Sequence, residues 1–565
     1  MNRSHSAPQA RAPRGGAALT AVATGVLLAC FGNARAFEID TGNPDLAVRW
    51  DNTVRYNFAV RTESRDSKIG NSVLADEGDY SFDKGDAVAK RLDLLSELDV
   101  VWRKQHGFRL SAAGWFDDAY GGSSKSNPNA PLNAIPSYVN HEYSPLVKRL
   151  YHGPSGEILD AFAFTGFDVG NVPVQLKAGR HSLYWGESLF LGGHMHSIAY
   201  AQNSLDLQKG FATPGVEAKE LFRPLNQVSG QAQLTDTLSV AGQYLLQWES
   251  TRYPEGGTYL GPVDFVFNGP DRQFLSAGAG FALRGDPSEP SQHGEFGLSA
   301  RWSPKPLDGG TVGFYYRRFA DKLPQVLLTR IGAANTSQYN MIYADGIDLY
   351  GVSFAKNIAG LSFGSEISTR RNTPLNAQVL GAAPGLPASG DTKGPRGDTW
   401  HALANVTGTF ARTAVFDAAV WAAELQWSEW SKVRSGANLF NAEGFAPCKG
   451  KDKWDGCTTK DYVGTSVIFT PTWYQVVPGV DLSAPITYAV GLHGNSAVTF
   501  GGNQGLGNYS VGLSADVQQK YRFDLKYIDY VGRYKDNGTA VTSTNGLTTF
   551  LKDRGFVSLT FKTTF

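Results

Sequence analysis

A short run of chemically versatile side chains lies at residues 179–188, where the sequence reads GRHSLYWGES. Arg180 and Glu187 carry opposite charges, and Trp185 between them offers a flat apolar surface. Side chains of these types form charged constrictions and amphipathic binding ledges in pores, which makes all three candidate substrate-binding residues. The structural alternative is that Arg180 and Glu187 pair with one another inside the protein, because a buried charge needs a partner to offset its lost hydration.

A second charged series occupies KRLDLLSELDVVW, residues 90–102, in which Arg91, Asp93 and Glu97 alternate with leucines. This pattern predicts a strand with one charged face, directed into a lumen where the three residues are further candidates for substrate contact. The segment around residues 80–100 is alternatively a plug that folds inward, and a merely solvated lumen face explains the charges equally well.

Catalytic and metal-binding patterns are scarce. The sequence has no Gly-x-Ser-x-Gly, no His-Glu-x-x-His and no Cys/His nucleophile arrangement, so we expect no enzyme and no cofactor. His194 and His196 in GGHMHS would share one face of a strand, but no third ligand is adjacent, and we expect no metal. Cys448 and Cys457 lie in the polar stretch CKGKDKWDGC, whose spacing is not that of a zinc site, and predict a loop disulfide.

The N-terminus has the pattern of a secretory signal peptide over residues 1–36. Arginines precede an apolar run at residues 17–31, and ARA at residues 34–36 predicts cleavage before Phe37. A lipoprotein signal at LLAC, with Cys30 lipidated, is the alternative. No other stretch approaches the roughly 20 apolar residues of a membrane helix.

Composition limits the class of protein further. The chain has 52 basic and 52 acidic residues, and four arginines leave with the signal, so the mature chain has a net charge of −4. This balance argues against nucleic acid as a partner. The remaining 529 residues contain no convincing linker, so the sequence describes either several soluble β domains or one large closed barrel.

Apolar and polar residues alternate with period two along most of the chain, which predicts strands rather than helices. Clear examples are LAVRWDNTVRYNFAV, LSVAGQYLLQW, EFGLSARW, TVGFYYRRF, YSVGLSADV and KYRFDLKY. Aromatic residues near the ends of the apolar faces, such as Trp248 and Trp302, favour a membrane barrel, because its interfaces carry aromatic girdles.

The C-terminus supports the barrel. In FVSLTFKTTF, Val557, Leu559, Phe561 and Phe565 share one face, and a terminal Phe is well placed at a membrane interface. Because every backbone group in a bilayer must be paired, the last strand should pair with the first. We predict an all-β, transmembrane antiparallel barrel of about 16 strands (14–18) with a partly occluded lumen. Long loops are expected at Asp66–Asp83, Gly121–Ile135, Tyr253–Gly269, Asn372–Gly397 and Val433–Asp461.

Several blocks are more specific than a generic barrel pattern. They are residues 82–100, 177–193, 203–228, 358–375, 476–488 and 552–565, of which GRHSLYWGES is the most distinctive part. Together they resemble the proteobacterial outer-membrane family catalogued as domain of unknown function 1302, over essentially the whole mature chain. The resemblance implies an outer-membrane β-barrel of a Gram-negative bacterium that moves hydrophobic compounds alongside periplasmic and inner-membrane transport proteins. The last strand also resembles the signal that the barrel-assembly machinery recognises, with Thr563 as a departure.

Three functions remain open. The first is a channel or carrier for hydrophobic or amphipathic small molecules, in which aromatic side chains bind the molecule and Arg/Glu pairs orient its polar group. The second is an open porin for hydrophilic solutes, and the third is a structural anchor for a periplasmic partner.

Overall fold

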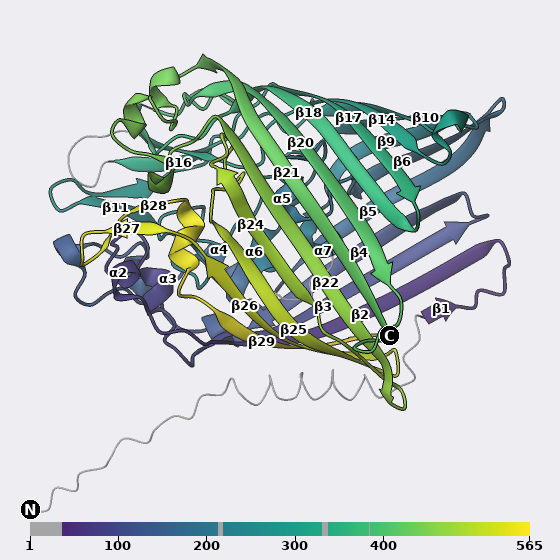
Figure 1. Ribbon diagram of the computed structural model, residues 1–565, viewed down its shortest axis with the longest axis horizontal. Helices are drawn as coiled ribbons and strands as arrows, with labels where there is room; N and C mark the ends of the chain where they lie inside the picture. The colour runs from purple at the N-terminus through teal and green to yellow at the C-terminus, as the bar shows by residue number, and fades with distance from the viewer. Residues whose placement is uncertain (1–36, 213–217, 330–336, 384) are drawn as a thin grey trace, which may run out of the picture.

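Eighteen antiparallel strands form one closed barrel in the computed structural model, which describes residues 37–212, 218–329, 337–383 and 385–565 (Figure 1). The predicted signal peptide, with Cys30, lies outside the described residues. In chain order the strands are β2 (Leu46–Arg61), β3 (Ala87–Trp102), β4 (His106–Asp117), β5 (Ser155–Val169), β6 (Val172–His181), β9 (Leu225–Thr235), β10 (Leu238–Leu245), β13 (Phe296–Trp302), β14 (Thr311–Phe319), β17 (Ile347–Ile358), β18 (Leu361–Pro374), β20 (Arg396–Phe410), β21 (Ala418–Ser435), β22 (Asp461–Val477), β24 (Ile486–Gly494), β25 (Gly507–Val517), β26 (Tyr521–Val531) and β29 (Phe556–Thr564). Two short strands, β1 (Phe37–Ile39) and β23 (Val480–Ser483), extend the same sheet.

The last strand closes the barrel against the first. Phe561 of β29 lies opposite Tyr56 of β2 on one side and Phe523 of β26 on the other. The terminal Phe565 exchanges both of its backbone hydrogen bonds with Asn52, at 2.8 and 2.9 Å. The predicted pairing of the two chain ends is therefore confirmed. The prediction of about 16 strands is two too low, although 18 lies within the stated range, because turns such as residues 170–171 and 359–360 use very few residues.

The alternation of side chains sorts the barrel into two faces. Along β2, Arg55 and Asn57 are buried inside, while Tyr56 and Phe58 are exposed on the outer surface. The outer surface is predominantly apolar, as lipid contact requires, and includes Leu94, Leu110, Ile158, Leu298, Phe314, Leu425, Leu525 and Leu559. Trp302 belongs to this surface, but Trp248 does not: β10 ends at Leu245, and Trp248 is buried beneath the loops. Among the described residues, no helix is both long enough and apolar enough to cross a membrane.

Connections at the two ends of the barrel differ in length. Short turns occupy the end at which the C-terminus lies, and long connections occupy the other end (Figure 1). Outer-membrane barrels have short periplasmic turns and long extracellular loops, which assigns the long-loop end to the cell exterior. The long loops contribute a five-stranded sheet made of β11 (Arg272–Ser276), β12 (Gly280–Arg284), β15 (Gln325–Thr329), β16 (Gln338–Ile342) and β19 (Leu380–Ala383). Cys448 and Cys457 form a disulfide in the loop between β21 and β22.

Residues 87–102 belong to the barrel wall. β3 pairs with β2 over Ala87–Trp102 and with β4 over Arg91–Trp102, with Asp93 opposite Arg55 and Glu97 opposite Ser111. Of the two alternatives for the segment around residues 80–100, the structure shows the strand and not the inward-folding plug. The lumen is instead crossed by a later part of the chain.

Candidate functional site

The connection between β6 and β9 folds into the barrel. We call residues 182–224, described as 182–212 and 218–224, the inward segment. It contains α5 (Leu191–His194), β7 (Ser204–Leu205), α6 (Leu207–Ala212), α7 (Ala218–Leu221) and β8 (Phe222–Arg223). Its contacts reach β18 and β21 on one side of the barrel and β2 on the other, so it spans the lumen.

Two glutamates of the wall hold the first part of the inward segment. Glu366 of β18 accepts backbone hydrogen bonds from Glu187, from Ser188 at 3.1 Å and from Ile198 at 2.7 Å. Glu424 of β21 accepts the backbone N–H groups of Leu189 and Phe190 at 2.7 and 3.3 Å. Each carboxylate thus satisfies several donors of a segment that has little secondary structure of its own.

Two arginines of the wall bind the carbonyl groups that follow. Arg317 of β14 donates to the carbonyls of Ile198 and Tyr200 at 2.8 and 2.7 Å. Arg370 of β18 donates to those of Met195 and Ser197 at 2.8 and 3.3 Å, and its guanidinium lies over the Tyr200 ring. Both arginines are fully buried, so the inward segment supplies the hydrogen bonds that make their burial tolerable.

The end of the inward segment is fixed by charge on the opposite wall. Glu220 accepts two hydrogen bonds from Arg55 of β2, at 2.8 and 3.0 Å, and forms an ion pair with Lys209 at 2.8 Å. Asp93 of β3 lies 3.6 Å from Arg55 and completes this group. Both ends of the crossing are therefore attached to the wall by buried charged side chains, the first through backbone groups and the second through ion pairs.

The predicted histidine pair does not form a metal site. His194 ends α5, and His196 follows it instead of sharing a strand face with it. His196 donates from Nε2 to the carbonyl of Gly501 at 2.7 Å, and its Nδ1 lies 3.1 Å from Nδ1 of His401. Within the described ranges, no group of three or more His, Cys, Asp or Glu side chains is arranged to hold a metal ion.

The cluster predicted from GRHSLYWGES is divided between two places. Trp185 and Glu187 lie in the inward segment, where Trp185 packs against Tyr315 and the Glu187 carboxylate accepts a hydrogen bond from Ser353 at 3.1 Å. Arg180 shares the outer face of β6 with the exposed Leu176, and it pairs with Glu249 at 2.8 Å. The predicted pairing of Arg180 with Glu187 is therefore wrong, because the chain turns into the lumen directly after β6 and carries the two residues apart.

The charged series of β3 does face the interior. Arg91 pairs with Asp93 at 3.1 Å and donates to the carbonyl of Leu150 at 3.4 Å. Glu97 pairs with Arg109 of β4. Of the three candidates on this strand, Arg91 lines the cavity described next.

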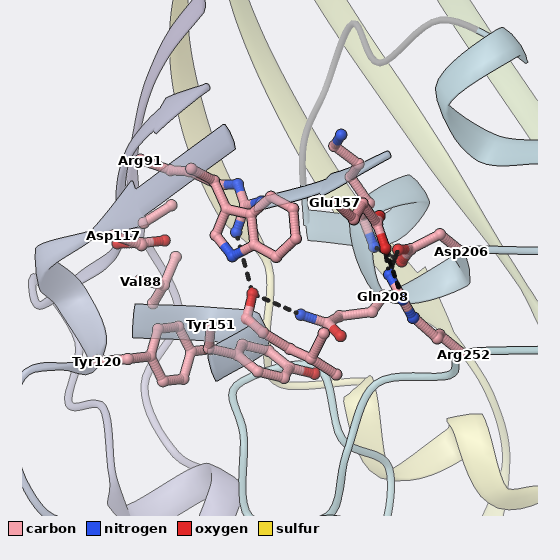
Figure 2. Close-up of a pocket in the computed structure, with 13 residues that line it drawn as sticks. Val88, Arg91, Asp117, Tyr120, Tyr151, Glu157, Asp206, Gln208 and Arg252 are labelled. Carbon is pink, nitrogen blue, oxygen red and sulfur yellow. Dashed lines mark hydrogen bonds and ion pairs between the residues drawn. The ribbon is translucent and has the colours of Figure 1, made fainter. Parts of the chain in front are cut away.

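A small cavity of about 30 Å³ lies between the inward segment, the β3–β5 wall and the extracellular loops (Figure 2). A second, adjoining cavity of about 20 Å³ extends it toward β2 and β29. The two regions share five lining residues, Val88, Ala89, Tyr120, Tyr151 and Gln208.

The cavity has an apolar end and a charged end. The apolar end is lined by Ala59, Tyr259, Leu260 and Phe556 together with the shared residues. The charged end is lined by Arg91, Asp117, Glu157, Asp206, Lys209 and Arg252, together with Trp115 and Leu150. Figure 2 shows the rings of Tyr120 and Tyr151 together on one side and the ion pairs of Arg252 on the other; the ring centroids are 4.8 Å apart.

Gln208 lies where the two ends of the cavity meet. Its side-chain N–H donates to the carbonyl of Leu150 at 3.3 Å. Its Oε1 atom is buried and has no hydrogen-bond partner among the described residues. A buried acceptor without a partner is costly, so this oxygen is a suitable place for a hydroxyl or amide N–H of a bound molecule.

Extracellular loops cover the cavity, and we call the covering parts of residues 62–86, 118–154, 246–295 and 532–555 the lid. The fully buried Arg554 donates to the carbonyls of Tyr259, Gly261 and Ala75, at 2.8, 2.8 and 3.1 Å, and thereby ties three of these loops together. Tyr138 donates to the carbonyl of Gly256 at 2.6 Å and attaches the fourth. The tyrosines at the apolar end of the cavity come from the same loops.

Three buried acids in the lid make it sensitive to pH. Burial raises the pKa of Glu77 to about 8 although Ser137 donates to it, burial also raises the pKa of Asp76 to about 6, and the pKa of Asp264 lies well above its usual range. Nearby Arg272 and Arg554 counter this effect only in part. An acid whose pKa is raised by folding stabilises the fold fully below its unfolded pKa and loses that contribution as pH rises through its folded pKa.

The lid should therefore loosen as pH rises from about 4, the usual pKa of a carboxyl group, to about 8. We expect proteolysis of the extracellular loops to be faster at pH 9 than at pH 6, and Glu77→Gln to reduce this difference several-fold. Glu142→Gln, at an exposed side chain of the same lid, is the matched control and should leave the difference unchanged. Equal cleavage rates at the two pH values in the unmodified protein would contradict the assignment.

The most important wall residues were not identified from the sequence. Glu366 and Arg370 lie in one of the blocks noted above, SEISTRR, and Glu424 lies in the apolar run AVWAAELQW. For Glu424, the available signal was a single charge at an inward position of an otherwise apolar run. Its meaning depends on what fills the lumen, which period-two alternation does not reveal.

Comparisons with known proteins show the family to which the chain belongs. A search among curated proteins finds no match. Solved structures that match include OccAB4 of Acinetobacter baumannii (10% identity, 92% of this chain and 98% of that chain, TM-score 0.41) and OccD3 (OpdP) of Pseudomonas aeruginosa (12%, 94% and 94%, 0.38). OpdK of Pseudomonas aeruginosa with vanillate also matches (8%, 92% and 98%, 0.39). The family described as "Protein of unknown function (DUF1302)" matches residues 17–565, and the chain therefore belongs to this family of outer-membrane β-barrels.

Proposed function

We propose that this protein is an outer-membrane channel or carrier that passes hydrophobic or amphipathic small molecules one at a time through the cavity beside the inward segment. The observation that carries the proposal is the pairing of a crossed lumen with a cavity that is apolar at one end and charged at the other. A molecule with an apolar body and one polar group matches the chemistry of both ends, and the lid moves to make room for it.

The bound molecule would be oriented by its polar group. The tyrosine-rich end provides aromatic contacts, and Gln208 offers an unpartnered acceptor. The Arg91 guanidinium pairs with the carboxylate of Asp93. Because a guanidinium has several N–H donors, it can also bind a second anionic group. A carboxylate or a hydroxyl at the charged end is the chemistry that these groups recognise best.

The inward segment argues against an open porin for hydrophilic solutes, because an open porin needs a continuous water-filled lumen. An open porin would give large, steady conductance in planar bilayers, whereas the proposed carrier would be nearly silent. No feature of the described residues favours the structural anchor over either of these functions.

The proposal includes the route to the outer membrane. Residues 1–36 would direct export, and the strand that ends in Val557, Leu559, Phe561 and Phe565 would be recognised by the barrel-assembly machinery. Periplasmic and inner-membrane transport proteins would receive or deliver the molecule, because the barrel itself holds no energy source.

Replacing Arg91 tests the proposal directly. We expect Arg91→Gln to weaken binding of 11-(dansylamino)undecanoic acid about tenfold or more, since a hydrogen bond to a charged group contributes ~1.5–3 kcal/mol. The corresponding alcohol lacks the carboxylate, so its affinity should change much less. Binding is measured as the increase in dansyl fluorescence on purified protein in detergent.

Arg109→Gln is the matched control, because Arg109 is an inward arginine of the adjacent strand that also pairs with carboxylates but does not line the cavity. Equal losses for the acid and the alcohol would show that Arg91 has no role in orienting the polar group. If the unmodified protein binds neither compound, the proposed function itself fails.

A further inference from the structure

The hydrogen-bonded wall of the barrel is interrupted beside the cavity. β5 pairs with β4 over Ser155–Thr165, but it pairs with β6 only over Ala161–Val169. Its extracellular part, Ser155–Asp160, has no strand partner on the β6 side among the described residues. We call the boundary along Ser155–Asp160 the seam.

The far side of the seam is built from a separate piece of structure. Beside this part of β5 lies the two-stranded sheet β7–β8 of the inward segment, which has no pairing with the main sheet in the described chain. Residues 249–252 run beside it: the Arg252 N–H donates to the carbonyl of Leu205, and the Leu207 N–H donates to the carbonyl of Arg252, both at 2.8 Å. We call β7–β8 together with residues 249–252 the extension.

Side chains, not ladder hydrogen bonds, bridge the seam. Arg252 donates to both carboxylate oxygens of Glu157 on β5, at 3.0 and 2.7 Å, and to Asp206 at 3.0 Å (Figure 2). All three residues line the charged end of the cavity. A second ion pair, between Arg180 and Glu249, lies at the end of β6 on the extension side. One latch of three charged groups, Glu157, Arg252 and Asp206, thus joins β5 to the extension.

The seam lies at the height of the membrane. A strand needs roughly 9–11 residues to cross the apolar band. Phe167, near the periplasmic turn of β5, is 42% exposed on the outer face, and Ile158 is 55% exposed on the same strand at the level of the latch. Ile158 is therefore a lipid-facing residue near the extracellular edge of the band. Ionisable residues within the membrane, such as Glu157 and Arg252, are typical of substrate or ion pathways.

We propose that the seam between Ser155–Asp160 of β5 and the extension at Asp206 and Arg252 is a lateral passage, through which the amphipathic molecule of the cavity moves between the barrel interior and the outer leaflet. The inference rests on the proposed function. An anionic group of the molecule competes with Glu157 for Arg252, which releases the latch. The apolar body then leaves or enters beside Ile158 without crossing water.

Covalent closure of the seam tests this inference. The double variant Glu157→Cys, Arg252→Cys is joined with a short bis-maleimide, and the same variant capped with N-ethylmaleimide is its matched control. The native Cys448 and Cys457 are disulfide-bonded and do not react. Binding of 11-(dansylamino)undecanoic acid is measured in detergent, and its uptake is measured in cells of a Gram-negative host that lacks its own fatty-acid channel.

We expect the cross-linked and the capped protein to bind the probe with dissociation constants within about twofold of each other, while uptake falls at least about tenfold on cross-linking. Uptake within twofold of the capped control would overturn the lateral passage and leave the proposed function standing. If neither the unmodified nor the capped protein binds the probe, the proposed function fails and the lateral passage fails with it.

A single substitution keeps the test decisive if the double variant does not fold. Ile158→Arg places a charge on the lipid side of the seam, outside the cavity, and should lower uptake several-fold without changing binding in detergent. Leu425→Arg is the matched control, because Leu425 is 50% exposed on the outer face of β21, away from the seam. Equal uptake by the two variants would count against the passage.

Discussion

A nearly silent barrel is expected to become a conducting pore when Glu366 and Glu424 are both replaced by alanine. These two carboxylates accept at least five backbone N–H groups of the inward segment. Hydrogen bonds to charged groups contribute ~1.5–3 kcal/mol each, and an irregular segment has no other partners for these donors. Without the two carboxylates, the first half of the inward segment should detach from the wall and open the lumen to water.

The measurement is single-channel conductance in planar bilayers. We expect the double variant to conduct at least about tenfold more than the unmodified protein, and Glu366→Ala alone to give brief openings, because Arg317 and Arg370 still bind four carbonyls of the segment. Cells that express the double variant should also become sensitive to large antibiotics that the outer membrane normally excludes.

Asp524→Ala is the matched control, since Asp524 is an inward, buried acid of β26 that pairs with Arg522 and not with the inward segment. It should remain as silent as the unmodified protein. Large, steady conductance in the unmodified protein would contradict the closed lumen and favour the open porin.

The sequence predicted the barrel well because every strand of a closed membrane sheet repeats the same alternation of lipid-facing and inward side chains. Period-two alternation and a terminal Phe565 follow directly from lipid on one face and paired strands throughout, and the pairing of β29 with β2 follows from closure. The disulfide followed from two cysteines in one polar loop. Each of these inferences uses local pattern and one global constraint.

The candidate site was harder to predict from the sequence than the barrel, for a physical reason. The inward segment has neither strand nor helix periodicity, and its shape is set by contacts with wall residues such as Glu366 and Glu424, which lie 179 and 235 residues away from their partners along the chain. Sequence identified Arg91 as an inward residue, but it assigned Arg180 and Glu187 to one cluster. The turn into the lumen after His181 separates them, and nothing in GRHSLYWGES predicts that turn.

The cavity itself can be filled without disturbing the wall. Ala89 is 5% exposed, faces inward from β3, and lines both the apolar and the charged region. Ala89→Phe should place a ring where the two regions meet and reduce both binding and uptake of 11-(dansylamino)undecanoic acid to background. Overpacking costs ~1–3 kcal/mol, which a barrel of this size tolerates. Folding is checked by the shift in electrophoretic mobility on heating.

Ala112→Phe introduces the same ring on the outer face of the adjacent strand β4, where lipid accommodates it, and should leave binding and uptake unchanged. The comparison separates two explanations of any loss: a general defect of the barrel would affect both variants, whereas a blocked cavity affects Ala89→Phe alone. Normal uptake by a folded Ala89→Phe protein would mean that the molecule passes elsewhere. The cavity would then be an incidental space between the inward segment and the wall, because a ligand that depends on its apolar end has no room beside the added ring.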